Sequence, residues 1–126
     1  MLHEKLAAYL ELIEKTIDGL ENVDIEHYSE ERISQSDVIL SIRIRFSSHA
    51  LLELNEAVFV ENDSLKHRKY RYHFQNGQHR LVFRYDSAPH FPELPTFPHH
   101  KHLPNATIAS TKPSIIAAIK EALANY

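Results

Sequence analysis

The stretch RKYRYHFQNGQHRLVFRYD, residues 68–86, constrains the fold more than any other part of the chain. Two runs of alternating polar and apolar residues flank Asn76 and Gly77. This dipeptide is typical of the two-residue type I′ turn that joins antiparallel strands. The stretch therefore predicts a β-hairpin, and a hairpin needs further strands or helices to bury its apolar face.

The alternation sorts the hairpin side chains onto two faces. The face toward the core carries the side chains of Tyr70, Tyr72, Phe74, Leu81, Phe83 and Tyr85. The opposite face carries those of Lys69, Arg71, His73, Arg80, Val82, Arg84 and Asp86. A two-residue turn would place Lys69 opposite Arg84, and like charges across antiparallel strands are destabilising. Arginine binds phosphate through its planar fork, so this face predicts an anion-binding surface.

Hydrophobic periodicity assigns the rest of the chain. Helical spacing covers residues 2–20 and 110–126, and Ser110 or Thr111 would cap the second helix. Alternation predicts strands over residues 37–46 and 51–60, with weaker signals at residues 22–28 and 106–110. We expect an α+β fold with an N-terminal helix, an antiparallel sheet of four to six strands and a C-terminal helix. Both helices would pack on one sheet face.

Length and composition exclude several classes of protein. The 126 residues suit a single domain, Met1–Tyr126. No cysteine is present, which excludes disulfides and thiolate metal sites, and two glycines leave no Gly-rich phosphate loop. The chain starts with glutamates where a signal peptide needs basic residues, and it has no run long enough to span a bilayer. We therefore expect a cytoplasmic protein with no membrane partner.

The charges are unevenly divided along the chain. Met1–Lys66 holds six lysines and arginines against fourteen acids, whereas His67–Tyr126 holds eight against three. Seven of the ten histidines also lie in the second part. A basic face built from this part would bind an anion such as nucleic-acid phosphate.

Four of the histidines lie in the stretch HFPELPTFPHHKH, residues 90–102, which its prolines predict to be a constrained loop rather than a helix or a central strand. His90, His100 and His102 could together ligate a metal ion. Lys101 lies between two of these candidates and would repel a cation, and histidine metal sites usually include a carboxylate. We expect no metal or other cofactor, and keep a metal-dependent hydrolase as an alternative.

Without a metal, imidazoles beside arginine and lysine fit phosphodiester cleavage, because histidine titrates near neutrality and can move protons in both directions. The candidate catalytic residues are His73, His99, His100, Lys101, His102 and Asp86. Lys101 would stabilise the transition state, and Asp86 would orient a histidine. The candidate substrate-binding residues are Lys69, Arg71, Arg80, Arg84, Arg43, Arg45 and His90.

The run YRYHFQNGQHRLVFRYDSAPHFPELPTFPHHKH, with LLELNEAV before it and PSIIAAIKEAL after it, resembles the TumE-type toxins of bacterial toxin–antitoxin pairs. The resemblance covers about residues 50–123. It implies a cytoplasmic toxin that a partner antitoxin neutralises, often one with a DNA-binding domain. By analogy of fold, the α, sheet, α plan is similar to that of RelE-like and barnase-like ribonucleases.

We therefore predict a metal-independent ribonuclease toxin that acts on RNA during translation. One alternative is a non-enzymatic module whose basic face binds nucleic acid or an acidic antitoxin. A homodimer is a further arrangement that the sequence leaves open.

Overall fold

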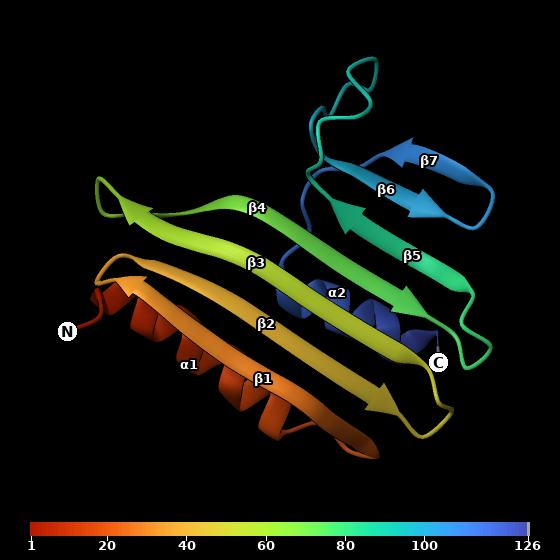
Figure 1. Ribbon diagram of the computed structural model, residues 1–126, viewed down its shortest axis with the longest axis horizontal. Helices are drawn as coiled ribbons and strands as arrows, with labels where there is room; N and C mark the ends of the chain where they lie inside the picture. The colour runs from red at the N-terminus through yellow and green to blue at the C-terminus, as the bar shows by residue number, and fades with distance from the viewer. Residues whose placement is uncertain (126) are drawn as a thin grey trace.

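The computed structural model describes residues 1–125 and contains one antiparallel sheet whose seven strands lie in sequence order (Figure 1). The strands are β1 (Val23–Ser34), β2 (Asp37–Phe46), β3 (Leu51–Glu61), β4 (Ser64–Gln75), β5 (Leu81–Asp86), β6 (His100–Leu103) and β7 (Ala106–Ala109). The helices are α1 (Glu4–Asp18) and α2 (Ile115–Ala124). The predicted α+β class with terminal helices is confirmed, but the sheet has seven strands rather than four to six.

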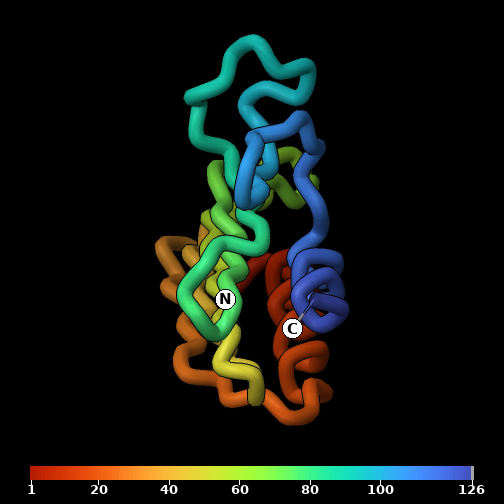
Figure 2. Tube along the Cα trace, turned by 90° about the vertical axis from the view of Figure 1, so that its right-hand side faces the viewer, coloured from red at the N-terminus to blue at the C-terminus, as the bar shows by residue number. Residues whose placement is uncertain are grey.

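Both helices lie against the same face of the sheet, as the side view shows (Figure 2). Their buried stripes are Leu6, Leu10, Ile13 and Ile17 in α1, and Ile115, Ala118, Ile119 and Ala122 in α2. The other sheet face is left open. Within residues 1–125, neither helix is both long enough and apolar enough to cross a membrane. Tyr126, which the sequence placed in the last helix, lies outside the described residues.

The cap of α2 differs from the prediction. Ser114, rather than Ser110 or Thr111, is the N-cap residue, and its hydroxyl accepts a hydrogen bond from the backbone N–H of Ala117. Proline disfavours helical backbone at the residue before it, so Pro113 keeps Lys112 out of a helix. The helix therefore begins at Ile115, after the Ser114 cap.

The extra strand is β6, which the sequence analysis treated as part of a loop. It pairs with β5 on one side and β7 on the other, so it is a central strand (Figure 1). The prolines stop at Pro98 and resume at Pro104, and the residues between them keep the N–H groups that a ladder needs. The four histidines therefore do not share one loop: His100 and His102 belong to the sheet.

The predicted register of the β4–β5 hairpin is wrong. His73 pairs with Arg84 rather than Arg80, and Arg71 pairs with Asp86. The side chain of Asn76 accepts hydrogen bonds from the N–H groups of Gln78 and Arg80, which stabilises a longer loop than a two-residue turn. From the Arg71–Asp86 pair to the Phe74–Phe83 pair the register differs by an even number of residues, so these side chains stay on their predicted faces. A bulge after Phe74 shifts the register by one residue, and Val82, predicted for the open face, packs against the core while Leu81 is only half-buried.

Gly77 has a different role from the one predicted. The residue with positive φ in this loop is His79, at 63°, and Gly77 is not in that conformation. A Cβ atom at position 77 would lie 2.6 Å from the carbonyl oxygen of Ser48. Glycine is needed here for the close approach of the β2–β3 and β4–β5 loops.

Glu56 is a buried acid between the sheet and the helices, with 2% of its surface exposed. Its carboxylate accepts hydrogen bonds from the hydroxyls of Tyr9 and Tyr72, and it lies 3.3 Å from Nε2 of His67. Burial by itself raises the pKa of Glu56. The hydrogen bond and charge of His67, with the hydrogen bonds of the two tyrosines, outweigh that effect and lower the pKa below its usual value.

We predict that Gly77→Ala lowers the free energy of unfolding by about 1–3 kcal/mol, because the new methyl group forces the Ser48 backbone to move. Urea unfolding would measure the change. Gln78→Ala is the control, since Gln78 is exposed and its substitution should stay within about 0.5 kcal/mol. Equal stability of the two variants would contradict the close approach.

We also predict that Glu56→Gln lowers the free energy of unfolding at pH 7 by about 1–3 kcal/mol, because three donors lose a charged acceptor. The lowered pKa means that this contribution is complete above the unfolded value of about 4.3 and is lost as pH falls through the folded value. The difference between the two proteins in urea unfolding should therefore shrink below about pH 4. Glu61→Gln, at an exposed ion pair with Lys66, is the control. A difference in the free energy of unfolding between the two proteins that stays constant with pH would contradict the lowered pKa of Glu56.

Candidate functional site

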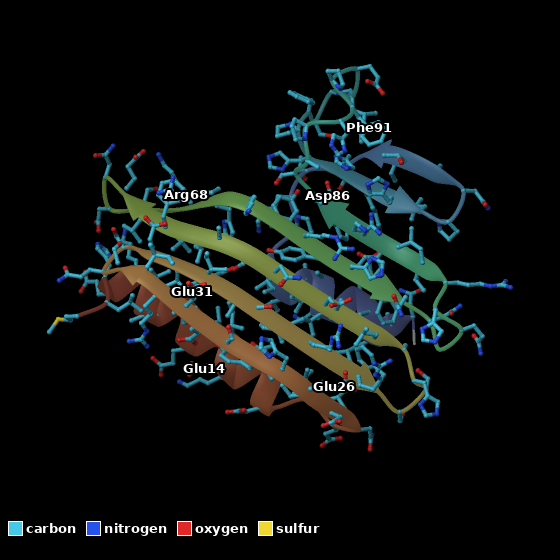
Figure 3. The ribbon with its side chains drawn as sticks, viewed as in Figure 1. Glu14, Glu26, Glu31, Arg68, Asp86 and Phe91 are labelled. Atoms are coloured by element: carbon cyan, nitrogen blue, oxygen red, sulfur yellow. The ribbon has the colours of Figure 1, made fainter. Side chains whose placement is uncertain are left out.

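A groove of about 600 Å³ lies on the open side of the sheet, along β4, β5 and the segment that follows β5. Figure 3 shows Asp86 at the end of β5 and Phe91 in the segment beyond it. The charged and imidazole side chains that line the groove are Arg68, Lys69, Arg71, Arg84, Asp86, His90 and His102. The hairpin alternation delivers Lys69, Arg71 and Arg84 to this face, as the sequence predicted.

The groove is lined by more lysines and arginines than carboxylates. Arg68 pairs with Asp37 at 3.1 Å, but the side chains of Lys69 and Arg71 are exposed and make no hydrogen bond or ion pair within residues 1–125. Arg84 also has no carboxylate within ion-pair distance among these residues. Burial and the charge of Arg71 lower the pKa of Arg84, against the weaker effect of Asp86. An excess of cations over carboxylates on one surface indicates a site for an anionic ligand.

His73 holds Arg84 in position. Its Nδ1 accepts a hydrogen bond from Nε of Arg84 at 3.1 Å, and its Nε2 lies 3.0 Å from Oε1 of Gln75. Burial lowers the pKa of His73, and the charges of Arg71 and Arg84 lower it further, so the ring is neutral at neutral pH. Both nitrogens are occupied, and the geometry of His73 fits a positioning residue rather than an acid or base.

Asp86, His100 and His102 form a compact cluster at the end of the groove. Nε2 of His100 lies 2.9 Å from Oδ1 of Asp86 and 3.1 Å from Nε2 of His102. Nε2 of His102 lies 3.4 Å from Oδ2 of Asp86. The pairing of β5 with β6 creates the cluster, since Asp86 lies opposite His100 and Arg84 lies opposite His102.

Exposure differs within the cluster. Asp86 and His100 are buried, whereas the His102 side chain is 23% exposed and lines the groove. Burial lowers the pKa of His102, and the attraction of Asp86 opposes this only in part. Phe91 covers the cluster with its ring edge-on to His100 and His102, at centroid distances of 4.9 and 5.9 Å. His102 is the member of the cluster that a ligand in the groove would reach.

Two predicted catalytic residues lie on the helix side of the sheet. Lys101 forms an ion pair with Glu121 of α2 at 2.7 Å and lies over the ring of Tyr85. His99 lies 2.9 Å from the hydroxyl of Tyr70 through Nδ1. Strand β6 alternates like any other strand, so Lys101 points away from His100 and His102. The structure does not bring Lys101 or His99 together with the cluster.

The remaining predicted residues are spread over the open side. Arg43 pairs with Glu53 at 3.2 Å, and Arg45 pairs with Glu26 at 3.0 Å, so both have counter-charges. Arg80 is exposed in the β4–β5 loop and does not line the groove. His90 is exposed at the groove but is not a member of the cluster.

Sequence reasoning missed three residues near the site. Arg68 and Phe91 line the groove, and Thr107 of β7 lies 3.1 Å from Nδ1 of His102 through its hydroxyl. Arg68 begins the hairpin stretch and could have been included from its charge. No pattern in the sequence indicates the contact of Thr107, because it depends on the pairing of β6 with β7.

The chain was compared with protein families, curated proteins and solved structures. The profile of one family, described as Toxin TumE, matches residues 10–125. No curated protein and no solved structure matched the chain. The match covers nearly the whole chain, including every residue of the groove and the cluster. The chain therefore belongs to the TumE toxin family.

Proposed function

We propose that this toxin binds RNA in the groove of the open sheet face and cleaves its phosphodiester backbone. The observation that carries the proposal is the row of cations Lys69, Arg71 and Arg84, which form no ion pair within the described residues and end at the Asp86–His100–His102 cluster. Phosphate oxygens would supply the missing negative charge. Membership of the TumE family supports the role of a toxin. The cations and the histidine cluster support RNA binding and phosphodiester cleavage.

The reaction that suits these groups is internal transesterification. The RNA 2′ oxygen forms a bond to the adjacent phosphorus while the bond from phosphorus to the 5′ oxygen breaks. The 2′ hydroxyl gives its proton to an acceptor at the cluster, and the departing 5′ oxygen takes up a proton. The products are a 2′,3′-cyclic phosphate and a 5′ hydroxyl, so no oxidant or second substrate is required.

The position of each residue indicates its part in the proposed reaction. Arg71 and Arg84 hold the phosphate and offset the charge that builds up on its oxygens. His73 fixes the guanidinium of Arg84 through the hydrogen bond to Nε. His102 is the cluster residue that is exposed to the groove. The buried Asp86 and His100 contact its ring and hold it in place.

A partner antitoxin is the second ligand that this surface suits. An acidic segment of the antitoxin would meet the same unpaired cations and block the groove. If the chain only binds and does not cleave, this is the function that the unpaired cations support. In either case, binding should weaken steeply as salt rises.

We predict that the purified chain cleaves single-stranded RNA and that Arg71→Ala and Arg84→Ala weaken RNA binding. Each variant should reduce the slope of log affinity against log salt by about 1, because one phosphate contact is lost. Arg43→Ala is the matched control, since it lies on the same face but is paired with Glu53. Fluorescence anisotropy over a range of salt concentrations measures binding, and gel analysis of the products measures cleavage.

His102→Ala should abolish cleavage while RNA affinity stays close to that of the unaltered chain. Binding without cleavage by the unaltered chain would favour the non-enzymatic alternative, and equal binding by the Arg71, Arg84 and Arg43 variants would contradict the groove. Cleavage that persists in EDTA would support the metal-independent reaction that the sequence predicts. Cleavage that EDTA abolishes would give a metal ion a part in it.

A further inference from the structure

We infer that Asp86, His100 and His102 form a binding site for a divalent first-row transition metal ion. Three potential ligand atoms converge here, one from each residue, all within 4.8 Å of one another. Two imidazoles and one carboxylate are a ligand set that zinc and iron sites use. This inference does not depend on RNA cleavage, because it concerns binding of the ion alone.

The separations between the ligand atoms match those around a metal ion. The two imidazole nitrogens lie 3.1 Å apart; Oδ1 of Asp86 lies 2.9 Å from Nε2 of His100, and Oδ2 of Asp86 lies 3.4 Å from Nε2 of His102. Ligands about 2.0–2.1 Å from a tetrahedral zinc ion lie about 3.3 Å from one another. The two nitrogens and the carboxylate therefore lie at separations that suit one face of a coordination shell.

Each imidazole is oriented by a second contact at Nδ1 that leaves Nε2 facing the site, and Asp86 has a backbone contact of its own. Nδ1 of His100 lies 3.0 Å from the carbonyl oxygen of Pro98, and Nδ1 of His102 lies 3.1 Å from the Thr107 hydroxyl. Oδ1 of Asp86 accepts a hydrogen bond from the N–H of Ala88 at 2.9 Å. Metal-binding histidines usually donate their other ring N–H to a carbonyl or a similar acceptor, and that contact fixes the tautomer.

The contact between the two imidazoles also fits a cation. Nε2 of His100 and Nε2 of His102 lie 3.1 Å apart, and each lies within 3.4 Å of a carboxylate oxygen of Asp86. A metal ion would bind both nitrogens and the carboxylate together.

The surroundings leave one side of the site open. Phe91 covers His100 and His102, while the partly exposed His102 faces the groove with Arg71 and Arg84. The repulsion expected from Lys101 does not arise, because Lys101 is paired with Glu121 on the other face. An ion here would keep an open coordination position toward the groove, and the arginines would favour an anionic ligand in it.

The test is zinc binding by the full chain, purified without a histidine tag, stripped of metal and titrated with Zn²⁺ in a calorimeter. We expect one ion per chain and an affinity that His102→Ala lowers by more than about 100-fold, since losing a ligand costs more than losing a contact that only orients one. Thr107→Val should lower the affinity by about tenfold, because it removes the partner of His102 Nδ1. His27→Ala, at an exposed histidine of β1 outside the groove, is the control and should bind zinc like the unaltered chain.

His102 is chosen because it is partly exposed, and circular dichroism of each variant confirms that it folds. Asp86→Asn provides a second variant that keeps the volume of the side chain and should also lose the high-affinity site. Equal zinc affinity of the unaltered chain and the folded His102→Ala and Asp86→Asn variants would overturn the inference. So would the absence of stoichiometric zinc binding by the unaltered chain.

Discussion

The burial of one side of the β4–β5 hairpin against the helices is the interaction on which the rest of the structure depends. Tyr72, Phe74 and Phe83 are each exposed by 1% or less, and they pack in one core with the buried stripes of α1 and α2. Because side chains alternate along a strand, burying these rings turns Arg71, His73 and Arg84 to the open face. The groove is thus a consequence of the core: the cations cannot move to the other face without bringing the rings into water.

Alternation also explains which parts of the fold could be predicted. The faces of the hairpin follow from a period of two and survive any even change of register. The register itself depends on the side chain of Asn76 and on the contact of Gly77 with Ser48, which the dipeptide Asn-Gly does not reveal. The strand β6 was missed because the prolines before it suggested a loop, although its own four residues contain none.

The sequence predicted which types of residue would form the candidate site, but not which of them would contact one another. Charge and alternation predicted Arg71 and Arg84 as site residues, and the histidines gathered in the proline-rich stretch predicted His100 and His102. The contact of Asp86 with both histidines, however, requires β5 to pair with β6 across the intervening proline-rich segment. For Glu56, in contrast, the sequence pattern indicates the kind of contact that the side chain makes. Glu56 shares its strand face with Leu52, Leu54 and Val58, and an acid on an otherwise apolar strand face indicates a buried polar network from the sequence pattern alone.

Polar side chains on the helix side of the sheet have hydrogen-bond or ion-pair partners within residues 1–125, whereas several on the open side do not. We infer that the first group stabilises the fold and that the second group binds a ligand. On the helix side Glu56 has three donors, Lys101 has Glu121, and His99 has Tyr70, so these groups stabilise the fold as it stands. On the open side the side chains of Lys69 and Arg71 form no ion pair within the described residues, and Asp86, which lies opposite Arg71, also contacts both histidines of the cluster. Asp86 is the single carboxylate among the described residues that line the groove, against four lysines and arginines, so the groove keeps an excess of positive charge. A bound anion in the groove would balance this excess, and a cation in the cluster would bind the imidazole nitrogens that lie 3.1 Å apart, which is why the open face is where this toxin is expected to act.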